Sequence, residues 1–105
     1  MIQLSELIEE LESIWPQSHA DDWDSVGLQV GSNAEQINKV LVAVDLTDDV
    51  IDEAIAVEAN LIVTHHPLLL KPVESVTDEK LKGSLITKLI KNSISLFTAH
   101  TNADV

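Results

Sequence analysis

The chain has 105 residues, enough for one domain, and a net charge of −12 from 18 acidic and 6 basic residues. A field of that sign repels nucleic-acid phosphates and anionic membranes, which argues against both as partners. Cysteine is absent, so disulfides and thiolate metal sites are excluded and a bound metal needs nitrogen and oxygen ligands. The apolar residues are mostly aliphatic, which favours buried strands covered by helices.

The first segment predicts an amphipathic helix with Ser5 as its N-cap and Pro16 as its stop. Residues 17–25 are polar and predict a loop, and residues 26–31 predict a short strand. The apolar face of the helix consists of Leu4, Leu7, Ile8, Leu11, Ile14 and Trp15.

Residues 39–45 form a near-continuous apolar run that predicts a strand buried on both faces. Thr47 then caps a helix whose acidic first turn suits the positive end of the helix dipole. Residues 60–64 predict the next strand. The apolar face expected for the helix consists of Val50, Ile51, Ala54, Ile55 and Ala59.

The remaining segments predict a helix over about 78–92, locally weakened by Gly83, and a last strand over 94–99. Strands that alternate with helices indicate βαβ units. We therefore expect an α/β fold, a mainly parallel sheet with flanking helices, as a single domain over residues 1–105. The core face expected for the last helix consists of Leu81, Leu85, Ile86, Leu89 and Ile90.

The first residues lack the basic region of a secretory leader. No run approaches the ~20 apolar residues that a membrane span needs. We therefore expect a cytoplasmic protein.

Polar side chains follow three predicted strands at their carboxyl ends, where the chemistry of open α/β sheets collects. Three of the four histidines lie at two of these ends, and parallel neighbouring strands would bring them together. Imidazole and carboxylate are ligands that Zn²⁺, Mn²⁺ and Fe²⁺ prefer, so the pattern indicates a divalent-metal site. The three segments are residues 45–47, 64–67 and 100–104.

On a regular strand His65 and His66 would point to opposite faces, but Pro67 breaks the ladder and lets them splay differently. Each histidine can then serve one of two neighbouring metals, with a carboxylate between them. The competing interpretation is a solvated turn. For Asp45, a residue at the helix start that satisfies backbone donors is a simpler interpretation than a ligand.

Other residues keep alternatives open. His100 is interpreted as a proton carrier, as a partner of a metal ligand, or as a turn residue. Trp23 is expected in the core, with a lid over the site or an oligomer contact as alternatives. His19 is expected at the surface, and residues 27–31 are not a phosphate loop because no Gly-Lys-Ser/Thr follows.

Four segments, in order along the chain, together resemble the signatures of the GTP cyclohydrolase type-two homologues, the Nif-three-like proteins. The resemblance covers essentially the whole chain and implies the N-terminal portion of the Nif-three-like fold. The segments are residues 22–31 (Asp-Trp-Asp-Ser-Val-Gly-Leu-Gln-Val-Gly), 45–47 (Asp-Leu-Thr), 62–68 (Ile-Val-Thr-His-His-Pro-Leu) and 99–104 (Ala-His-Thr-Asn-Ala-Asp).

This resemblance implies a dinuclear site, with two divalent ions per full-length subunit. By position, His65 and His66 match the paired histidine ligands, one for each metal, and Asp104 matches the carboxylate ligand. His100 matches a histidine near the same site and is the candidate catalytic residue. Family members also tend to form ring-shaped homohexamers whose sites face an internal cavity.

The family's chains are more than twice this length, and a His and a Glu four residues apart near their C-terminus complete the ligand set. No such pair follows Asp104 in this sequence. We therefore expect an N-terminal piece of a longer protein, in which His65, His66 and Asp104 alone hold one metal loosely.

Four functional hypotheses follow. The first is a metal-dependent hydrolase of GTP cyclohydrolase type, acting on a nucleotide-like ring, in which His100 moves protons. The strong acidity of the chain opposes this, because the metals or the rest of the protein must then attract the anionic substrate.

The second hypothesis is a metal-binding regulatory or scaffold protein that forms a ring without catalysis. The third is a two-metal phosphoesterase, and the fourth is an inactive N-terminal fragment whose exposed apolar edges cause dimerisation or aggregation.

Overall fold

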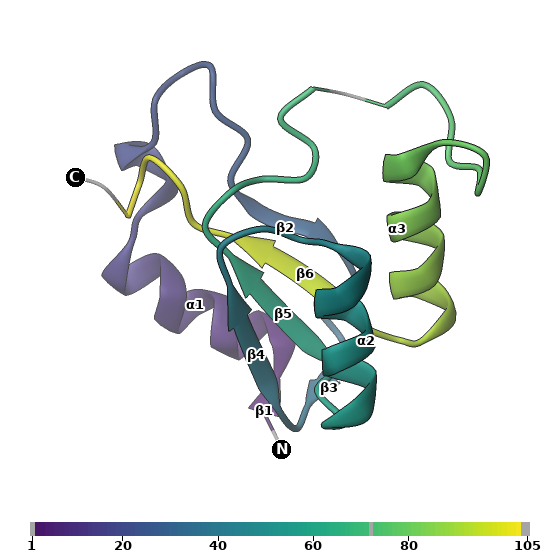
Figure 1. The fold of residues 1–105 in the computed structure, drawn as a ribbon. Coiled ribbons are helices and arrows are strands. Elements are labelled where there is room, and N and C mark those ends of the chain that lie inside the picture. The colour runs from purple at the N-terminus through teal and green to yellow at the C-terminus, as the bar shows by residue number, and fades with distance from the viewer. Residues whose placement is uncertain (1, 72, 104–105) are drawn as a thin grey trace.

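The computed structural model describes residues 2–71 and 73–103, which form a four-stranded sheet with helices on both faces (Figure 1). No helix in these ranges is long and apolar enough to cross a membrane. The elements are β1 (Ile2–Gln3), α1 (Leu4–Ile14), the short 3₁₀ helix η1 (Gln17–His19), β2 (Gly27–Val30), β3 (Gln36–Ile37), β4 (Val40–Ala43), α2 (Asp48–Ala56), β5 (Leu61–Thr64), α3 (Leu81–Lys91) and β6 (Ser95–Thr98).

The sheet has the strand order β2-β6-β5-β4, and the prediction of a mainly parallel α/β sheet is confirmed. β5 is parallel to β4 and to β6, and the crossovers between them carry α2 and α3. β2 pairs antiparallel with β6 at one edge. An antiparallel pair of two-residue strands, β1 and β3, was not predicted.

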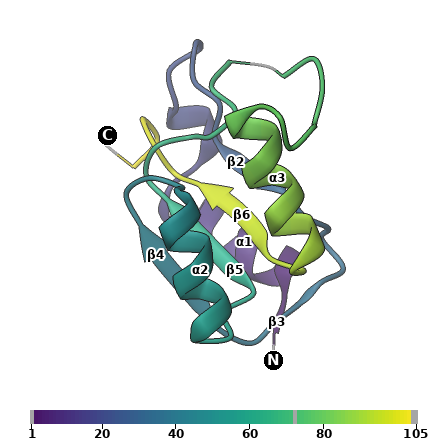
Figure 2. The same cartoon turned by 45° about the vertical axis from the view of Figure 1, so that its right-hand side comes forward.

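Two apolar clusters hold the layers together, one on each face of the sheet. α2 and α3 lie on one face and α1 on the other, as Figures 1 and 2 show from two directions. Because side chains alternate along a strand, Ile62 faces the α2/α3 layer while its neighbours Leu61 and Val63 join the α1 cluster.

The prediction that residues 39–45 form a strand buried on both faces is wrong. β4 is an edge strand, and the side chains of Val40 and Val42 are 41% and 74% exposed. The apolar cluster beneath α1 includes Leu61, Val63 and Phe97, whereas the β4 valines lie outside it. α1 therefore covers the two central strands and leaves one face of β4 open.

The helix boundaries differ from the predictions at two N-termini. α1 begins at Leu4 with Gln3 as N-cap, so Ser5 lies inside the first turn and caps nothing. The third helix begins at Leu81 with Lys80 as N-cap, rather than near residue 78. The cap predicted at Thr47 is confirmed, because its Oγ1 accepts a hydrogen bond from the Val50 N–H at 3.2 Å.

Four residues assigned to helix core faces are exposed instead. Leu81 and Ile90 of α3 are 77% and 62% exposed, while Leu85, Ile86 and Leu89 are buried as predicted. Ile14 in α1 and Ile55 in α2 are likewise exposed. These residues lie at helix ends or at the margin of the apolar stripe, where helical spacing alone does not tell the core from its edge.

Gly83 has a structural role that its low helix propensity did not indicate. A Cβ at this position would overlap the backbone of Thr77, which packs directly against the first turn of α3. Gly83 therefore lets the segment before α3 lie against the helix.

Candidate metal centre

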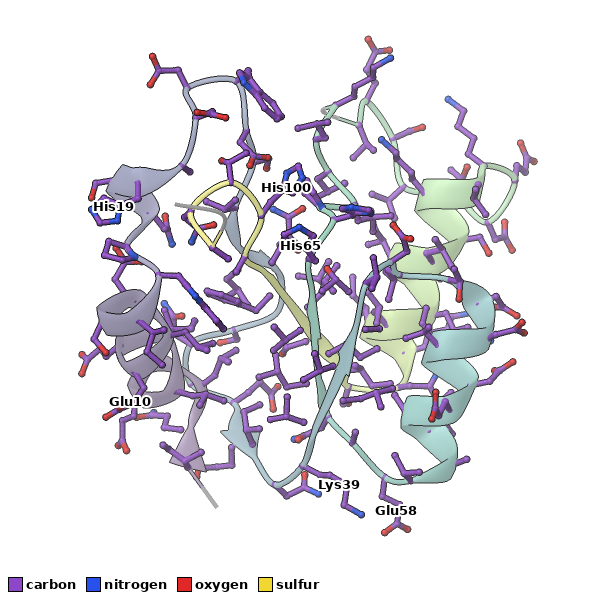
Figure 3. The ribbon with its side chains drawn as sticks, turned by 60° about the vertical axis from the view of Figure 1, so that its left-hand side comes forward. Glu10, His19, Lys39, Glu58, His65 and His100 are labelled. Atoms are coloured by element: carbon purple, nitrogen blue, oxygen red, sulfur yellow. The ribbon has the colours of Figure 1, made fainter. Side chains whose placement is uncertain are left out.

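The carboxyl ends of β5 and β6 bring three histidines together. The ring centroids lie 5.3 Å apart for His65 and His66, 5.1 Å for His65 and His100, and 5.5 Å for His66 and His100. One nitrogen from each imidazole lies within 4.8 Å of those of the other two. Figure 3 shows His65 and His100 side by side at this end of the sheet, with Lys39 at the opposite end.

The adjacent histidines do not diverge as they would on a regular strand. The N–H groups of His65 and His66 donate to the carbonyls of Ala43 and Val44, at 3.3 and 2.9 Å. Backbone hydrogen bonding to the chain at and after β4 therefore continues past the end of β5. The buried Thr64 hydroxyl donates to the His66 carbonyl at 3.0 Å and curls the chain there. The two imidazoles lie together at the strand end, with their ring centroids 5.3 Å apart.

Each of the three imidazoles directs its Nδ1 at an oxygen acceptor. A carbonyl or a carboxylate can only accept, so each Nδ1 donates in these bonds, and Nε2 is then the ring nitrogen that can coordinate a metal. This arrangement fixes the tautomer and the ring orientation of histidines that bind metals. The pairs are His65 Nδ1 with the Ala99 carbonyl at 3.0 Å, His66 Nδ1 with Asp45 Oδ1 at 2.7 Å, and His100 Nδ1 with Asp24 Oδ1 at 3.1 Å.

Asp24 is a buried anion beside His100. Burial by itself raises the pKa of this carboxyl, but hydrogen bonds from Thr101, His100 and Ser25 outweigh it and bring the pKa to about 2. Its Oδ2 accepts from the Thr101 N–H at 3.0 Å and from the Thr101 hydroxyl at 2.7 Å. Asp24 therefore stays ionised over the working range of a protein and holds the His100 ring in place.

The loop that carries His100 is anchored to α1. The Asn102 side chain is 3% exposed, accepts from the His100 N–H at 2.9 Å and donates to the Trp15 carbonyl at 2.9 Å. Thr101 Oγ1 also accepts from the Asp21 N–H at 2.8 Å, which joins the loop to the segment before β2. Contacts from two distant parts of the chain thus position this histidine.

The structure brings His65, His66 and His100 together as expected from the strand order, and their role as metal ligands or proton carriers stays a prediction. Asp104, the predicted carboxylate ligand, lies outside the described residues. His19 is exposed on η1, away from the cluster, as predicted (Figure 3).

Two interpretations are corrected by the structure. Asp45 does not serve the start of α2, where Thr47 is the cap; its carboxylate pairs with His66. Trp23 is not in the core, because it is 62% exposed and meets His100 edge-on at a centroid distance of 6.0 Å.

Sequence reasoning missed the roles of Asp24 and Asn102. Both lie in polar segments that were assigned to loops, and Asp24 is 76 positions from His100. The one available signal was that both residues belong to the motifs that carry the family resemblance.

A second group of possible cation ligands, Asp48, Asp49 and Asp52, lies on the exposed surface of α2. Lys88 donates to Asp48 at 2.7 Å and to Asp52 at 2.6 Å, and these contacts raise the pKa of Lys88. A lysine already occupies the space between two of the carboxylates, so we assign no cation site there.

Two cavities flank the histidine cluster. One, of about 330 Å³, reaches toward α3 and includes His66 and Asp45 in its lining. The other, of about 340 Å³, includes His65 and the exposed face of β4, with Val42 and Val63 in its apolar lining. His66 therefore faces one of these cavities and His65 faces the other.

The fold and the cluster define an α/β protein with a strand-end histidine centre, and comparison with known proteins identifies the family. The model of the family Duf34/NIF3 (NGG1p interacting factor 3) matches residues 2–105, and the chain belongs to this family.

Curated relatives and solved structures agree with this assignment. The chain is 45% identical to the GTP cyclohydrolase 1 type 2 homolog of Streptomyces coelicolor over 99% of its own length and 36% of that protein. It matches a Bacillus cereus protein related to NIF3 with a TM-score of 0.93 at 41% identity, over 99% of this chain and 29% of the other. A Staphylococcus aureus protein gives 0.95 at 39% identity, over 99% and 34%. The chain thus spans about a third of the proteins it matches.

Proposed function

We propose that His65 and His66 bind divalent metal at the carboxyl end of the sheet, with Asp104 as the carboxylate ligand and His100 as a proton carrier beside them. The observation that supports this most directly is the hydrogen bonding of Nδ1 in all three histidines. With Nδ1 donating in these bonds, coordination or proton transfer would use Nε2, and one nitrogen of each ring lies within 4.8 Å of the other two.

The donor set fits a borderline metal such as Zn²⁺, Mn²⁺ or Fe²⁺. Imidazole nitrogens suit these ions, and the Asp45 carboxylate at 2.7 Å from His66 Nδ1 fixes the orientation of that ring. A divalent ion held by these residues would supply Lewis acidity and would lower the pKa of a water molecule bound to it.

The role proposed for His100 follows from its contact with Asp24. The Asp24 carboxylate holds Nδ1, so Nε2 is the ring nitrogen at which a proton would be transferred. The reaction we propose for the full-length protein is the hydrolytic opening of a nucleotide-like ring, in which His100 transfers the proton.

Metal content tests the ligand assignment. The natural protein, dialysed exhaustively, would be compared by elemental analysis with His65→Ala, His66→Ala, His100→Ala and the matched control His19→Ala. We expect metal to be lost from the His65 and His66 variants and kept by the control and by His100→Ala. Metal loss from His100→Ala would make this residue a ligand, and metal retained by both His65→Ala and His66→Ala would refute the site.

Activity tests the reaction. The natural protein would be incubated with GTP and divalent metal while purine absorbance is followed, with a generic phosphodiester assayed in parallel. Ring opening that is lost in His100→Ala while metal content is unchanged supports the proposal. Cleavage of the phosphodiester with intact GTP would favour the two-metal phosphoesterase.

A second candidate function is assembly into a ring-shaped homo-oligomer that binds metal without catalysis. The observation that favours it is the open face of the edge strand β4, where Val40 and Val42, and Val44 just after the strand, are each more than 40% exposed. Sedimentation of the natural protein beside Val42→Lys tests it. A smaller species for the variant supports assembly through β4, and an unchanged size contradicts it.

A further inference from the structure

The cavity beside His66 lies between the segment after β5 and the first turn of α3. Its volume, about 330 Å³, is within the range of small-molecule sites. Its lining combines His66 and Asp45 of the histidine centre with two lysines, Lys71 and Lys82. A molecule in this cavity would therefore touch the candidate metal centre and two cations at once.

Pro67 and five leucines form the remaining walls of the cavity. Leu68 and Leu85 continue the apolar core, whereas Leu81 is 77% exposed and Leu70 is 41% exposed. Large apolar side chains exposed around one cavity form a surface for the apolar or planar body of a ligand.

The two lysines are unusual in this chain because positive charge is scarce. The sequence has 6 basic residues against 18 acidic ones, and two of the six line this cavity. Within residues 2–71 and 73–103, the lysine salt bridges are those of Lys88, so neither Lys71 nor Lys82 is neutralised by a carboxylate. Their ammonium groups are available to an anion, and Lys82 is half-buried.

We propose that this cavity binds a phosphate-bearing small molecule. The phosphate lies on Lys71 and Lys82, the less polar body packs against Leu81 and Leu70, and the opposite end reaches His66. The inference rests on the proposed function, since it names the ligand class of the same centre. It also provides a local attraction for an anionic substrate in a chain of net charge −12.

The test measures binding of guanosine monophosphate and of guanosine to the natural protein by calorimetry, with a metal chelator present so that the lysines act alone. Lys71→Gln/Lys82→Gln is compared with Lys39→Gln/Lys91→Gln, which removes the same charge outside the cavity. We expect the first variant to weaken binding of the monophosphate by about tenfold or more and to leave guanosine unchanged. The control should stay within about twofold of the parent.

Three results would overturn the proposal: no binding of the monophosphate by the parent, equal binding by the cavity variant, or an equal loss in the control. Metal content is measured on the same samples without chelator. If the parent retains metal but does not bind the monophosphate, the proposal for the cavity is refuted and the proposal for the metal centre is not. If the monophosphate binds in a lysine-dependent way but the protein holds no metal, the proposal for the metal centre is refuted instead. Thermal unfolding of each variant checks that the fold is intact.

Discussion

The imidazole of His100 and the carboxylate of Asp24 form a partly buried pair, with Nδ1 3.1 Å from Oδ1 and 3.0 Å from Oδ2. The Asp24 side chain is fully inaccessible to solvent, and the His100 side chain is 20% exposed. The pair joins the segment before β2 to the loop after β6, so it contributes to the fold as well as to the centre.

Replacing Asp24 by Asn should destabilise the metal-free protein in a pH-dependent way. The pKa of Asp24 falls from 3.8 to about 2 on folding, so the ionised group stabilises the protein by about 2 kcal/mol. Because the pKa is lowered, this stabilisation is fully present above pH ~4 and is lost as the pH falls to about 2. Urea unfolding should show the variant less stable at neutral pH, with the difference shrinking in acid.

The control for this prediction is Asp22→Asn, an exposed carboxylate in the same segment. It should stay within about 0.5 kcal/mol of the parent at every pH. A constant difference between Asp24→Asn and the parent across the acid range would contradict the assignment of Asp24 as the titrating group.

Asp45→Asn should weaken metal retention without unfolding the protein. The carboxylate lies 2.7 Å from His66 Nδ1 and is 59% exposed, so it orients the ring while contributing little to packing. Loss of a group that is hydrogen-bonded to a metal-binding histidine lowers metal affinity by about 10- to 100-fold. Competition with a chromophoric chelator would measure this, with Asp49→Asn as a charge-matched variant; equal affinity in both would show that Asp45 has no orienting role.

Gly83→Ala should destabilise the protein, although alanine favours a helix over glycine by about 1 kcal/mol. The added methyl would collide with the Thr77 backbone, which cannot rotate away as a flexible side chain could. We expect a loss of about 1–3 kcal/mol in the free energy of unfolding, measured by thermal or urea denaturation. Ser84→Ala in the same helix should be close to neutral, and a stabilised Gly83→Ala would mean that this segment is free to move.

Thr64→Val should cost more stability than Thr98→Val. The two buried hydroxyls lie 2.9 Å apart, but only Thr64 also donates to the His66 carbonyl, at 3.0 Å. Valine at 64 leaves that carbonyl and the Thr98 hydroxyl without this partner, a loss of about 1–3 kcal/mol, whereas valine at 98 removes one bond. Chemical denaturation of both variants measures the difference, and equal losses would contradict the role of Thr64 in the turn before His66.

Apolar periodicity in the sequence was sufficient to predict the three main helices and the four strands of the sheet. Periodicity is a local property, and β5 and β6 are short, almost fully buried strands that lie in the middle of the sheet. Because parallel strands end at one edge, the convergence of His65, His66 and His100 was also predictable.

What the sequence determined by itself was therefore the α/β architecture and the edge of the sheet at which the histidines meet. Tertiary structure alone decided that Asp24 pairs with His100 and Asp45 with His66. It also decided that the Thr77 backbone packs against Gly83 and that β4 is an edge strand of the sheet. Each of these depends on which distant segments come into contact. Local propensity and periodicity carry no information about partners 21 or 76 residues away, because such contacts form only when the layers pack.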